Sequence, residues 1–198
     1  MSLSLQQPAS QPRQQAIPAS YGFHPIPTSV IHTVAHEFGH VLGMYHEHQR
    51  DDRDHYVRYQ CEKLEGYDQA KKDVEAKGQH TIEEVCASVS LGYEYNFPSA
   101  PQFSTQRYFD DLGGIYVTKG GEYDWHSIMH YTSDAFHNDR LSRDPPNVPL
   151  FRWVNGDPDF QPPPVDHTPT ADEAKLIGWN EQETTDDLYS HIQTLYPW

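Results

Sequence analysis

Residues 36–47 read HEFGHVLGMYHE and hold three histidines at spacings that suit a metal site. His36 and His40 are four residues apart, so on a helix both imidazoles leave the same face and can bind one Zn²⁺. Gly43 can end the helix and turn the chain, which would let His46 return as a third ligand. Three histidines leave one coordination position open for water, the arrangement of catalytic rather than structural zinc.

Glu37 lies beside the paired histidines without being a ligand, where it could take a proton from zinc-bound water. His32 precedes His36 by four residues on the same face, and we expect it to line or support the site rather than bind zinc. A bare HExxH occurs by chance in other proteins. The zinc site is favoured because a glycine and a third histidine follow at this spacing.

A helix over residues 28–43 is predicted to carry these side chains. Pro27 precedes it, and Thr28 or Ser29 can cap it by accepting a bond from an otherwise unpaired backbone N–H. Apolar residues recur at helical spacing and form one stripe, which comprises Val30, Ile31, Val34, Ala35, Phe38, Val41 and Leu42.

The rest of the chain is predicted to alternate short elements with irregular segments. The charged run 62–77 indicates a solvated helix, and residues 115–117 indicate a short strand. Residues 145–169 contain eight prolines and should form an irregular loop. Two short helices should come next, the first with Thr170 and Glu173 as its capping box. The second would present a stripe of Leu188, Ile192, Leu195 and Tyr196.

Composition narrows the function classes. The 198 residues suit one domain, and the 14 Lys and Arg against 29 Asp and Glu give a net charge of −15. Phosphate recognition needs a basic face, so we expect no nucleic-acid partner. No apolar run approaches the roughly 20 residues of a transmembrane helix, so no membrane partner is expected. The first 20 residues contain no apolar segment typical of a secretory signal.

The remaining cysteines and histidines add no second site. Cys61 and Cys86 could form one disulfide or remain two buried thiols. Nothing in the spacing of four later histidines indicates another metal, so we expect surface or packing roles for His126, His130, His137 and His167.

The sequence from His36 to Val57 resembles the astacin family of zinc endopeptidases, a branch of the metzincins. The family pattern HExxHxxGxxHExxRxDRDxYV matches HEFGHVLGMYHEHQRDDRDHYV at every specified position. Residues 123–131, YDWHSIMHY, resemble the Met-turn of the family. Met129 would then form the hydrophobic floor beneath the zinc, and Tyr131 would be the tyrosine ligand of the family.

The resemblance implies an α+β, metzincin-type fold, mainly the C-terminal subdomain with its active-site helix, Met-turn, irregular loops and C-terminal helices. It implies one Zn²⁺ per chain held by His36, His40, His46 and Tyr131. Glu37 would be the general base, and Tyr131 would swing away from zinc to donate a hydrogen bond to the oxyanion. The substrate would be a protein or peptide, and the protein would be secreted and monomeric.

The same resemblance assigns roles to a charged segment after the third histidine. Glu47 matches the glutamate that binds the N-terminus of the activated enzyme in the family. We expect Arg50, Asp52, Arg53 and Asp54 to form structural ion pairs.

The domain organisation is expected to depart from the family in two places. Residues 1–22 should be a flexible leader rich in Gln, Pro and Ser, and residues 23–198 an astacin-like domain that lacks most of the N-terminal subdomain. The apolar stripe of the zinc helix would then lack part of its partner surface. Residues of about 60–120 should hold an insertion, because 85 residues separate His46 from Tyr131.

These observations leave several candidate functions. The first is a zinc-dependent endopeptidase with a Glu-activated, zinc-bound water. The second is a noncatalytic remnant that keeps zinc as a structural clip. Another metzincin branch fits His36 to His46 equally well, but Glu47 and the surroundings of Tyr131 argue against it. An acidic interaction module would require two accidental motif matches.

Overall fold

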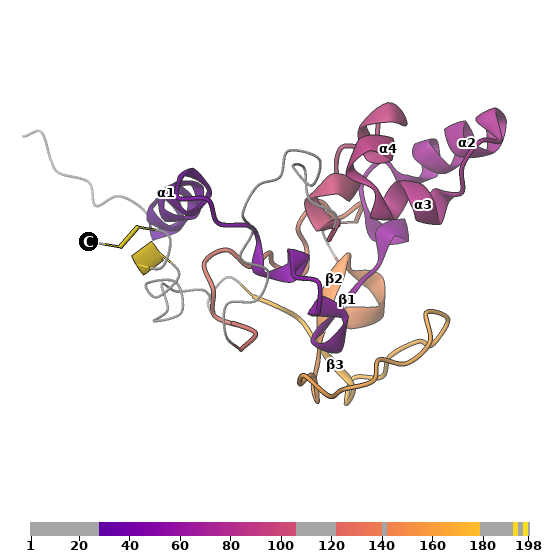
Figure 1. Cartoon of the computed structure of the whole chain (residues 1–198). Helices are drawn as coiled ribbons and strands as arrows, with labels where there is room; N and C mark the ends of the chain where they lie inside the picture. Colours follow the sequence, from indigo (N-terminus) through magenta and orange to yellow (C-terminus); the bar gives the residue numbers. More distant parts are fainter. Residues whose placement is uncertain (1–27, 106–121, 140–141, 179–191, 194–195, 198) are drawn as a thin grey trace, which may run out of the picture.

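The computed structural model describes residues 28–105, 122–139, 142–178, 192–193 and 196–197 (Figure 1). Its helices are α1 (Thr28–Val41), α2 (Tyr67–Lys77), α3 (Ile82–Ala87) and α4 (Val89–Glu94). Its strands are β1 (Val57–Tyr59), β2 (Leu150–Trp153) and β3 (Ala174–Lys175), which form one antiparallel sheet in the order β1-β2-β3. The predicted α+β class is therefore confirmed.

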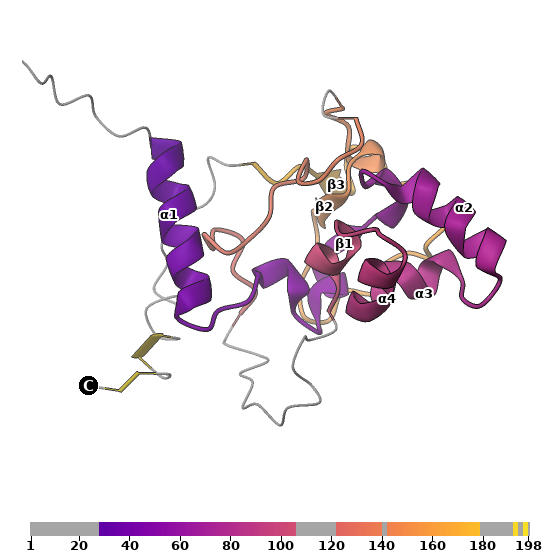
Figure 2. The ribbon, with the colours of Figure 1, turned by 90° about the horizontal axis from the view of Figure 1, so that it is seen from above.

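Helix α1 lies at one end of the molecule, away from α2, α3 and α4 in both views of the ribbon (Figures 1 and 2). It ends at Val41, and Gly43 then turns the chain with a φ of +88°. The predicted apolar stripe is largely exposed. The exposed side chains are Val30, Ile31, Val34, Phe38 and Val41, with exposed fractions from 47% to 76%.

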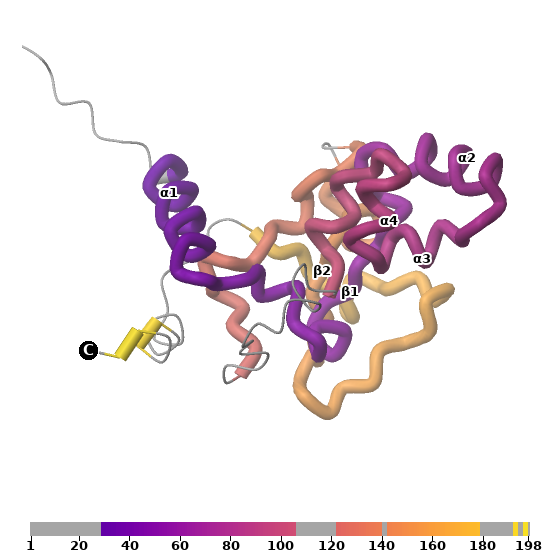
Figure 3. Tube along the Cα trace, turned by 45° about the horizontal axis from the view of Figure 1, so that its top comes forward, coloured from indigo at the N-terminus to yellow at the C-terminus, as the bar shows by residue number. Residues whose placement is uncertain are grey.

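Strand β2 corrects the expectation of an irregular loop over residues 145–169. Its four residues follow Pro149 and are free of proline, so every backbone N–H can join a ladder. Val57 pairs with Arg152, and Tyr59 pairs with Leu150. The sheet buries Leu150 and the neighbouring bulky side chains of β2. Only beyond β2 does the proline-rich segment run irregularly, looping away before it returns as β3 (Figure 3).

The helix predicted to begin at Thr170 is also wrong. The backbone N–H and the hydroxyl of Thr170 both donate to Glu173 Oε2, at 2.8 and 2.9 Å, so the bond from the backbone N–H supplies one half of the capping box. It closes a turn instead of a helix, because Ala174 then pairs with Trp153 in the sheet. Tertiary pairing here overrides the local signal.

Helices α2, α3 and α4 pack with the 3₁₀ turn η4 (Ala100–Phe103) into a helical lobe beside the sheet (Figure 3). The predicted helix over 62–77 begins only at Tyr67, because Gly66 precedes it with a φ of +94°. Thr81 caps α3 through a capping box with Glu84. The core of the lobe is apolar and includes Val74, Val85, Phe97, Ala100 and Phe103.

A disulfide joins Cys61 to Cys86, which decides between the two alternatives left by the sequence. Their Cα atoms are 6.0 Å apart, within the range that the bond requires. The bond ties the segment after β1 to α3 and closes a loop across a sequence separation of 25.

Replacing both Cys61 and Cys86 by Ala is expected to lower the free energy of unfolding by about 3 kcal/mol, because an open loop of this size gains chain entropy when unfolded. Denaturant unfolding of the metal-free protein measures the change. Reduction of the parent protein should produce the same loss. An unchanged unfolding midpoint in both experiments would contradict the prediction.

Some predicted elements lie outside the described residues: the leader 1–22, the strand 115–117 and most of the last helical stripe. Among the residues that are described, no helix combines the length and the apolar character needed to cross a membrane.

Candidate metal centre

The structure brings His36, His40 and His46 together. One nitrogen from each ring belongs to a group in which all ligand atoms lie within 4.8 Å of one another. Nε2 of His46 lies 3.2 Å from Nε2 of His36 and 3.2 Å from Nε2 of His40. His32 is not part of this group and instead lines the adjoining pocket.

Two features of the fold place the three rings. His36 and His40 project from successive turns of α1, with ring centroids 4.8 Å apart. His46 comes from the chain beyond the turn at Gly43, and its ring lies edge-on to that of His40. The third ligand therefore approaches from a different direction than the first two.

In each histidine Nε2 faces the other two rings, and Nδ1 forms a hydrogen bond with an oxygen atom. The Nδ1 contacts are His36 with Ile128 O at 2.8 Å, His40 with Met44 O at 2.9 Å, and His46 with Gln49 Oε1 at 2.8 Å. A carbonyl oxygen only accepts, so Nδ1 must carry the proton in all three rings. The three Nε2 lone pairs then face one another, which is the arrangement that a metal ion satisfies.

This donor set fits zinc. With Zn–N bonds of 2.0–2.1 Å, two nitrogens of a tetrahedral site are about 3.3 Å apart, close to the 3.2 Å separations found here. Burial, with a smaller contribution from the charges of the neighbouring histidines, lowers the pKa of His46 to about 3 against the opposing effect of Gln49. The ring is therefore neutral near pH 7, as a metal ligand must be.

The tight turn at residues 127–130 packs against α1. Met129 is 1% exposed, and its sulfur packs on Gly39, where an added Cβ would lie 2.3 Å from Sδ. The Met129 carbonyl accepts from the backbone N–H of Glu47 at 3.1 Å. The turn itself is closed by a 2.9 Å bond from His130 N to Ser127 O. Only glycine at position 39 permits this approach.

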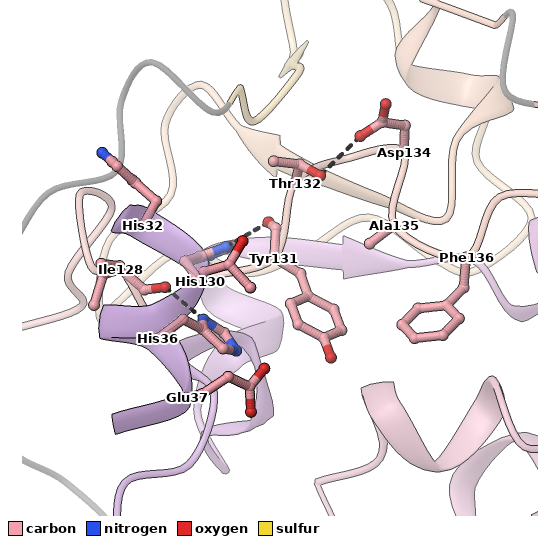
Figure 4. Close-up of a pocket in the computed structure, with 11 residues that line it drawn as sticks. His32, His36, Glu37, Ile128, His130, Tyr131, Thr132, Asp134, Ala135 and Phe136 are labelled. Atoms are coloured by element: carbon pink, nitrogen blue, oxygen red, sulfur yellow. Dashed lines mark hydrogen bonds between the residues drawn. The ribbon is translucent and has the colours of Figure 1, made fainter. Parts of the chain in front are cut away.

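An open pocket of about 420 Å³ adjoins the histidines. Glu37 and Tyr131 both line it, and Figure 4 shows their polar ends directed toward the same part of the pocket. The Tyr131 ring lies 4.1 Å from that of His46, centroid to centroid, and its hydroxyl donates to Gln102 Oε1 at 3.2 Å. Burial, with the charge of Glu37, raises the pKa of Tyr131 to about 12, so the phenol keeps its proton.

The charged residues after the third histidine form the expected ion pairs. Arg50 donates to both carboxylate oxygens of Asp52, at 2.9 and 3.0 Å. It also donates to Glu47 Oε1 at 2.9 Å, and the same oxygen accepts from the backbone N–H of Asp124. Burial raises the pKa of Glu47, while these two donors oppose the shift.

Arg53 connects the centre to the helical lobe. It pairs with Asp54 at 3.3 Å and donates to the carbonyls of His48 and Phe103. His48 is fully buried and contacts the carbonyl of Gln102 through Nε2 at 3.0 Å.

The sequence did not predict a role for two polar residues that lie near the metal centre. Gln49 contacts His46, and Gln102 contacts Tyr131. Gln49 follows His46 by three residues, and this spacing was a usable signal for a partner of that ring. Gln102 is 29 residues from Tyr131 in the sequence and offered no local signal. His130, expected to have a surface or packing role, is 1% exposed and contacts the Tyr123 hydroxyl at 2.8 Å.

Comparison with known proteins gives the same resemblance as the motifs. Residues 28–108 match the sequence model of the Astacin peptidase family. The zinc metalloproteinase nas-39 of Caenorhabditis elegans is 35% identical over 103 residues, which are 52% of this chain and 7% of that protein. Human meprin A subunit beta is 32% identical over 108 residues, 54% of this chain and 10% of that protein.

A third relative, the zinc metalloproteinase dpy-31 of Caenorhabditis elegans, is 35% identical over 89 residues, 43% of this chain and 14% of that protein. The chain therefore spans between 7% and 14% of the lengths of these relatives. The family match includes all three histidines and Glu37, whereas Met129 and Tyr131 lie beyond its end.

Proposed function

Because residues 28–108 belong to the astacin family, we propose that this chain is a zinc-dependent endopeptidase that hydrolyses peptide bonds of proteins. The observation that carries the proposal is the convergence of three Nε2 lone pairs, each fixed by an oxygen on the opposite ring nitrogen. This arrangement stands beside an open pocket of about 420 Å³, which is the proposed binding site of the peptide.

In this proposal His36, His40 and His46 hold one Zn²⁺ per chain. When bound, the ion would polarise the scissile carbonyl and lower the pKa of a water molecule. The chain supplies the remaining functions: it binds the peptide, moves a proton and stabilises the developing negative charge.

Glu37 is the proposed general base. Its carboxylate is exposed in the pocket and follows His36 directly on α1, so it can accept a proton from the attacking water. The same carboxyl group can then pass that proton to the departing amine. Peptide hydrolysis requires both transfers, because an amide anion is a very poor leaving group.

Tyr131 is the proposed donor to the oxyanion. Its raised pKa keeps the phenolic proton in place, and a neutral phenol can donate one hydrogen bond. In the resting state Tyr131 would also be the fourth protein ligand, exchanging its bond with Gln102 for the metal. The hydrogen bond to Gln102 Oε1 is the contact that the hydroxyl would give up when it binds the metal.

We also propose the finer architecture that the family implies. Residues 23–198 would be a metzincin-type domain, mainly its C-terminal subdomain, with an insertion over about 60–120 and a leader over 1–22. Helix α1 would be the active-site helix, and the turn that packs Met129 on Gly39 would be the Met-turn. Secretion fits the disulfide, which persists in oxidising compartments, and the monomeric state is proposed from the family resemblance alone.

Metal removal tests the proposed function. The purified chain should contain one zinc and cleave fluorescent casein; a chelator should abolish cleavage, and added zinc should restore it. His46→Ala should lose both zinc and cleavage, whereas His126→Ala, which changes an exposed histidine, should keep both. Cleavage that survives complete zinc removal would refute the proposal. Stoichiometric zinc without cleavage would instead support the alternative of a noncatalytic zinc-binding protein.

A further inference from the structure

We propose that Gln49 is a positioning residue that fixes the tautomer of His46, and that the turn at residues 101–104 holds Gln49 in this role. The proposal rests on the metal-binding part of the proposed function. Among the three histidines, His46 is the one whose Nδ1 bonds to a side chain, because Nδ1 of His36 and of His40 bonds to a backbone carbonyl.

The orientation of the Gln49 amide is set by its partners. Its Nε2 donates to the carbonyls of Pro101 at 3.3 Å and Ser104 at 3.0 Å. An amide nitrogen carries two hydrogens, and two acceptors use both. The reversed amide would set its oxygen against two carbonyl oxygens, so Oε1 must be the atom that lies 2.8 Å from His46 Nδ1.

The orientation of the amide in turn fixes the imidazole. Oε1 has no hydrogen to donate, so the bond to His46 exists only when Nδ1 carries the proton. The proton is thereby excluded from Nε2, whose lone pair faces His36 and His40. Free neutral imidazole divides its proton between both nitrogens. Gln49 therefore selects the form of His46 that can bind a metal.

The acceptors of Gln49 belong to a segment that other hydrogen bonds tie to the helical lobe and to the residues after His46. Ser104 is 2% exposed, and its hydroxyl donates to the carbonyl of Ala87 at the end of α3, next to the disulfide-bonded Cys86. The same short segment accepts from His48 and Arg53 through the carbonyls at positions 102 and 103. The helical lobe thus sets the position of Gln49, and Gln49 sets that of a metal ligand.

The test compares Gln49→Leu with Gln60→Leu. Gln60 is a matched control, because its Nε2 also donates to two carbonyls, those of Pro145 at 3.2 Å and Val148 at 2.7 Å. Zinc affinity is measured by competition with a chromogenic chelator. We expect Gln49→Leu to weaken it about 10- to 100-fold, the effect usual for partners of ligating histidines. We expect Gln60→Leu to leave it within about twofold of the parent, although both variants lose two similar hydrogen bonds.

A second readout separates positioning from a merely structural role. Long-range ¹H–¹⁵N correlation spectra of the metal-free protein report which nitrogen of His46 carries the proton. The parent should show the proton on Nδ1, and Gln49→Leu should show a mixture or Nε2–H. Gln49→Glu keeps an acceptor for Nδ1–H but sets its second oxygen against the carbonyls of Pro101 and Ser104, so it should retain the parent tautomer and lose less zinc affinity than Gln49→Leu. This variant also gives the answer if Gln49→Leu fails to fold.

The outcomes separate this proposal from the proposed function. A parent chain that binds no zinc would refute the function itself. A parent that binds zinc, together with a Gln49→Leu variant of unchanged affinity and unchanged tautomer, would overturn only the role of Gln49. A folded Gln49→Glu variant that shows the same tautomer as the Leu variant would also overturn it, because the acceptor would then be irrelevant.

Discussion

Replacing Glu37 by Gln is expected to lower kcat/KM for casein cleavage by about 10²- to 10⁴-fold, the contribution usual for a general base. The amide keeps the size of the carboxylate but cannot accept a proton. Glu37 is exposed in the pocket and takes no part in the histidine cluster, so zinc content should remain one per chain. Cleavage rates and zinc stoichiometry are measured on the same preparation.

Tyr131→Phe provides the comparison for this result. It removes the hydroxyl that donates to Gln102 while keeping the ring that packs 4.1 Å from the ring of His46. We expect a loss of about 10²- to 10³-fold in kcat, as for one oxyanion donor. A Glu37→Gln variant with parental activity would exclude Glu37 as the base, whatever the result for Tyr131.

Acidification of the metal-free protein from pH 7 to pH 5 should lower its stability steeply. Burial lowers the pKa of His46 to about 3, that of His130 to about 4 and that of His48 well below its ordinary value. In the unfolded chain the same rings titrate near 6.5. Between the two pKa values the unfolded state binds more protons, so stability falls as the pH falls through 6.5 toward 4.

The expected loss at pH 5 is about 2 kcal/mol each for His46 and His130, and His48 adds to the loss in the same direction. Together they approach the total stability of an ordinary domain. Denaturant unfolding at pH 7, 6 and 5 in the presence of a chelator measures the slope. His126→Gln changes an exposed histidine and should leave the slope unaltered. Stability that is flat over this range would show that the three buried rings are not held neutral by the fold.

Local spacing was sufficient to predict the helix that carries His36 and His40 and the approach of His46 from beyond Gly43. The periodicity and the turn signal both lie within one short segment, so few long-range contacts could change the outcome. Resemblance placed Met129 and Tyr131 near the same centre although about 85 residues separate them from the histidines. The spacing of residues alone could not have predicted that Met129 and Tyr131 lie near the histidines.

Other features depended on contacts that one sequence does not reveal. The strand Leu150–Trp153 was hidden among prolines, because its pairing with β1 is set by a segment about 90 residues earlier. Thr170 and Glu173 interact as a local cap would, yet pairing in the sheet determines the conformation of the next residues. The disulfide needed the helical lobe to bring two thiols together, and the lobe itself depends on long-range packing.

The carbonyls of Ile128 and Met44 that hold His36 and His40 have a consequence for how this centre can change during evolution. Every amino acid supplies the same carbonyl oxygen, so these two hydrogen bonds depend on the path of the backbone and not on the identity of the side chain. A substitution at position 44 or 128 therefore keeps the hydrogen bond as long as the new side chain fits the apolar cluster that both residues join. Position 49 lacks this freedom, since its acceptor exists only in the side chain.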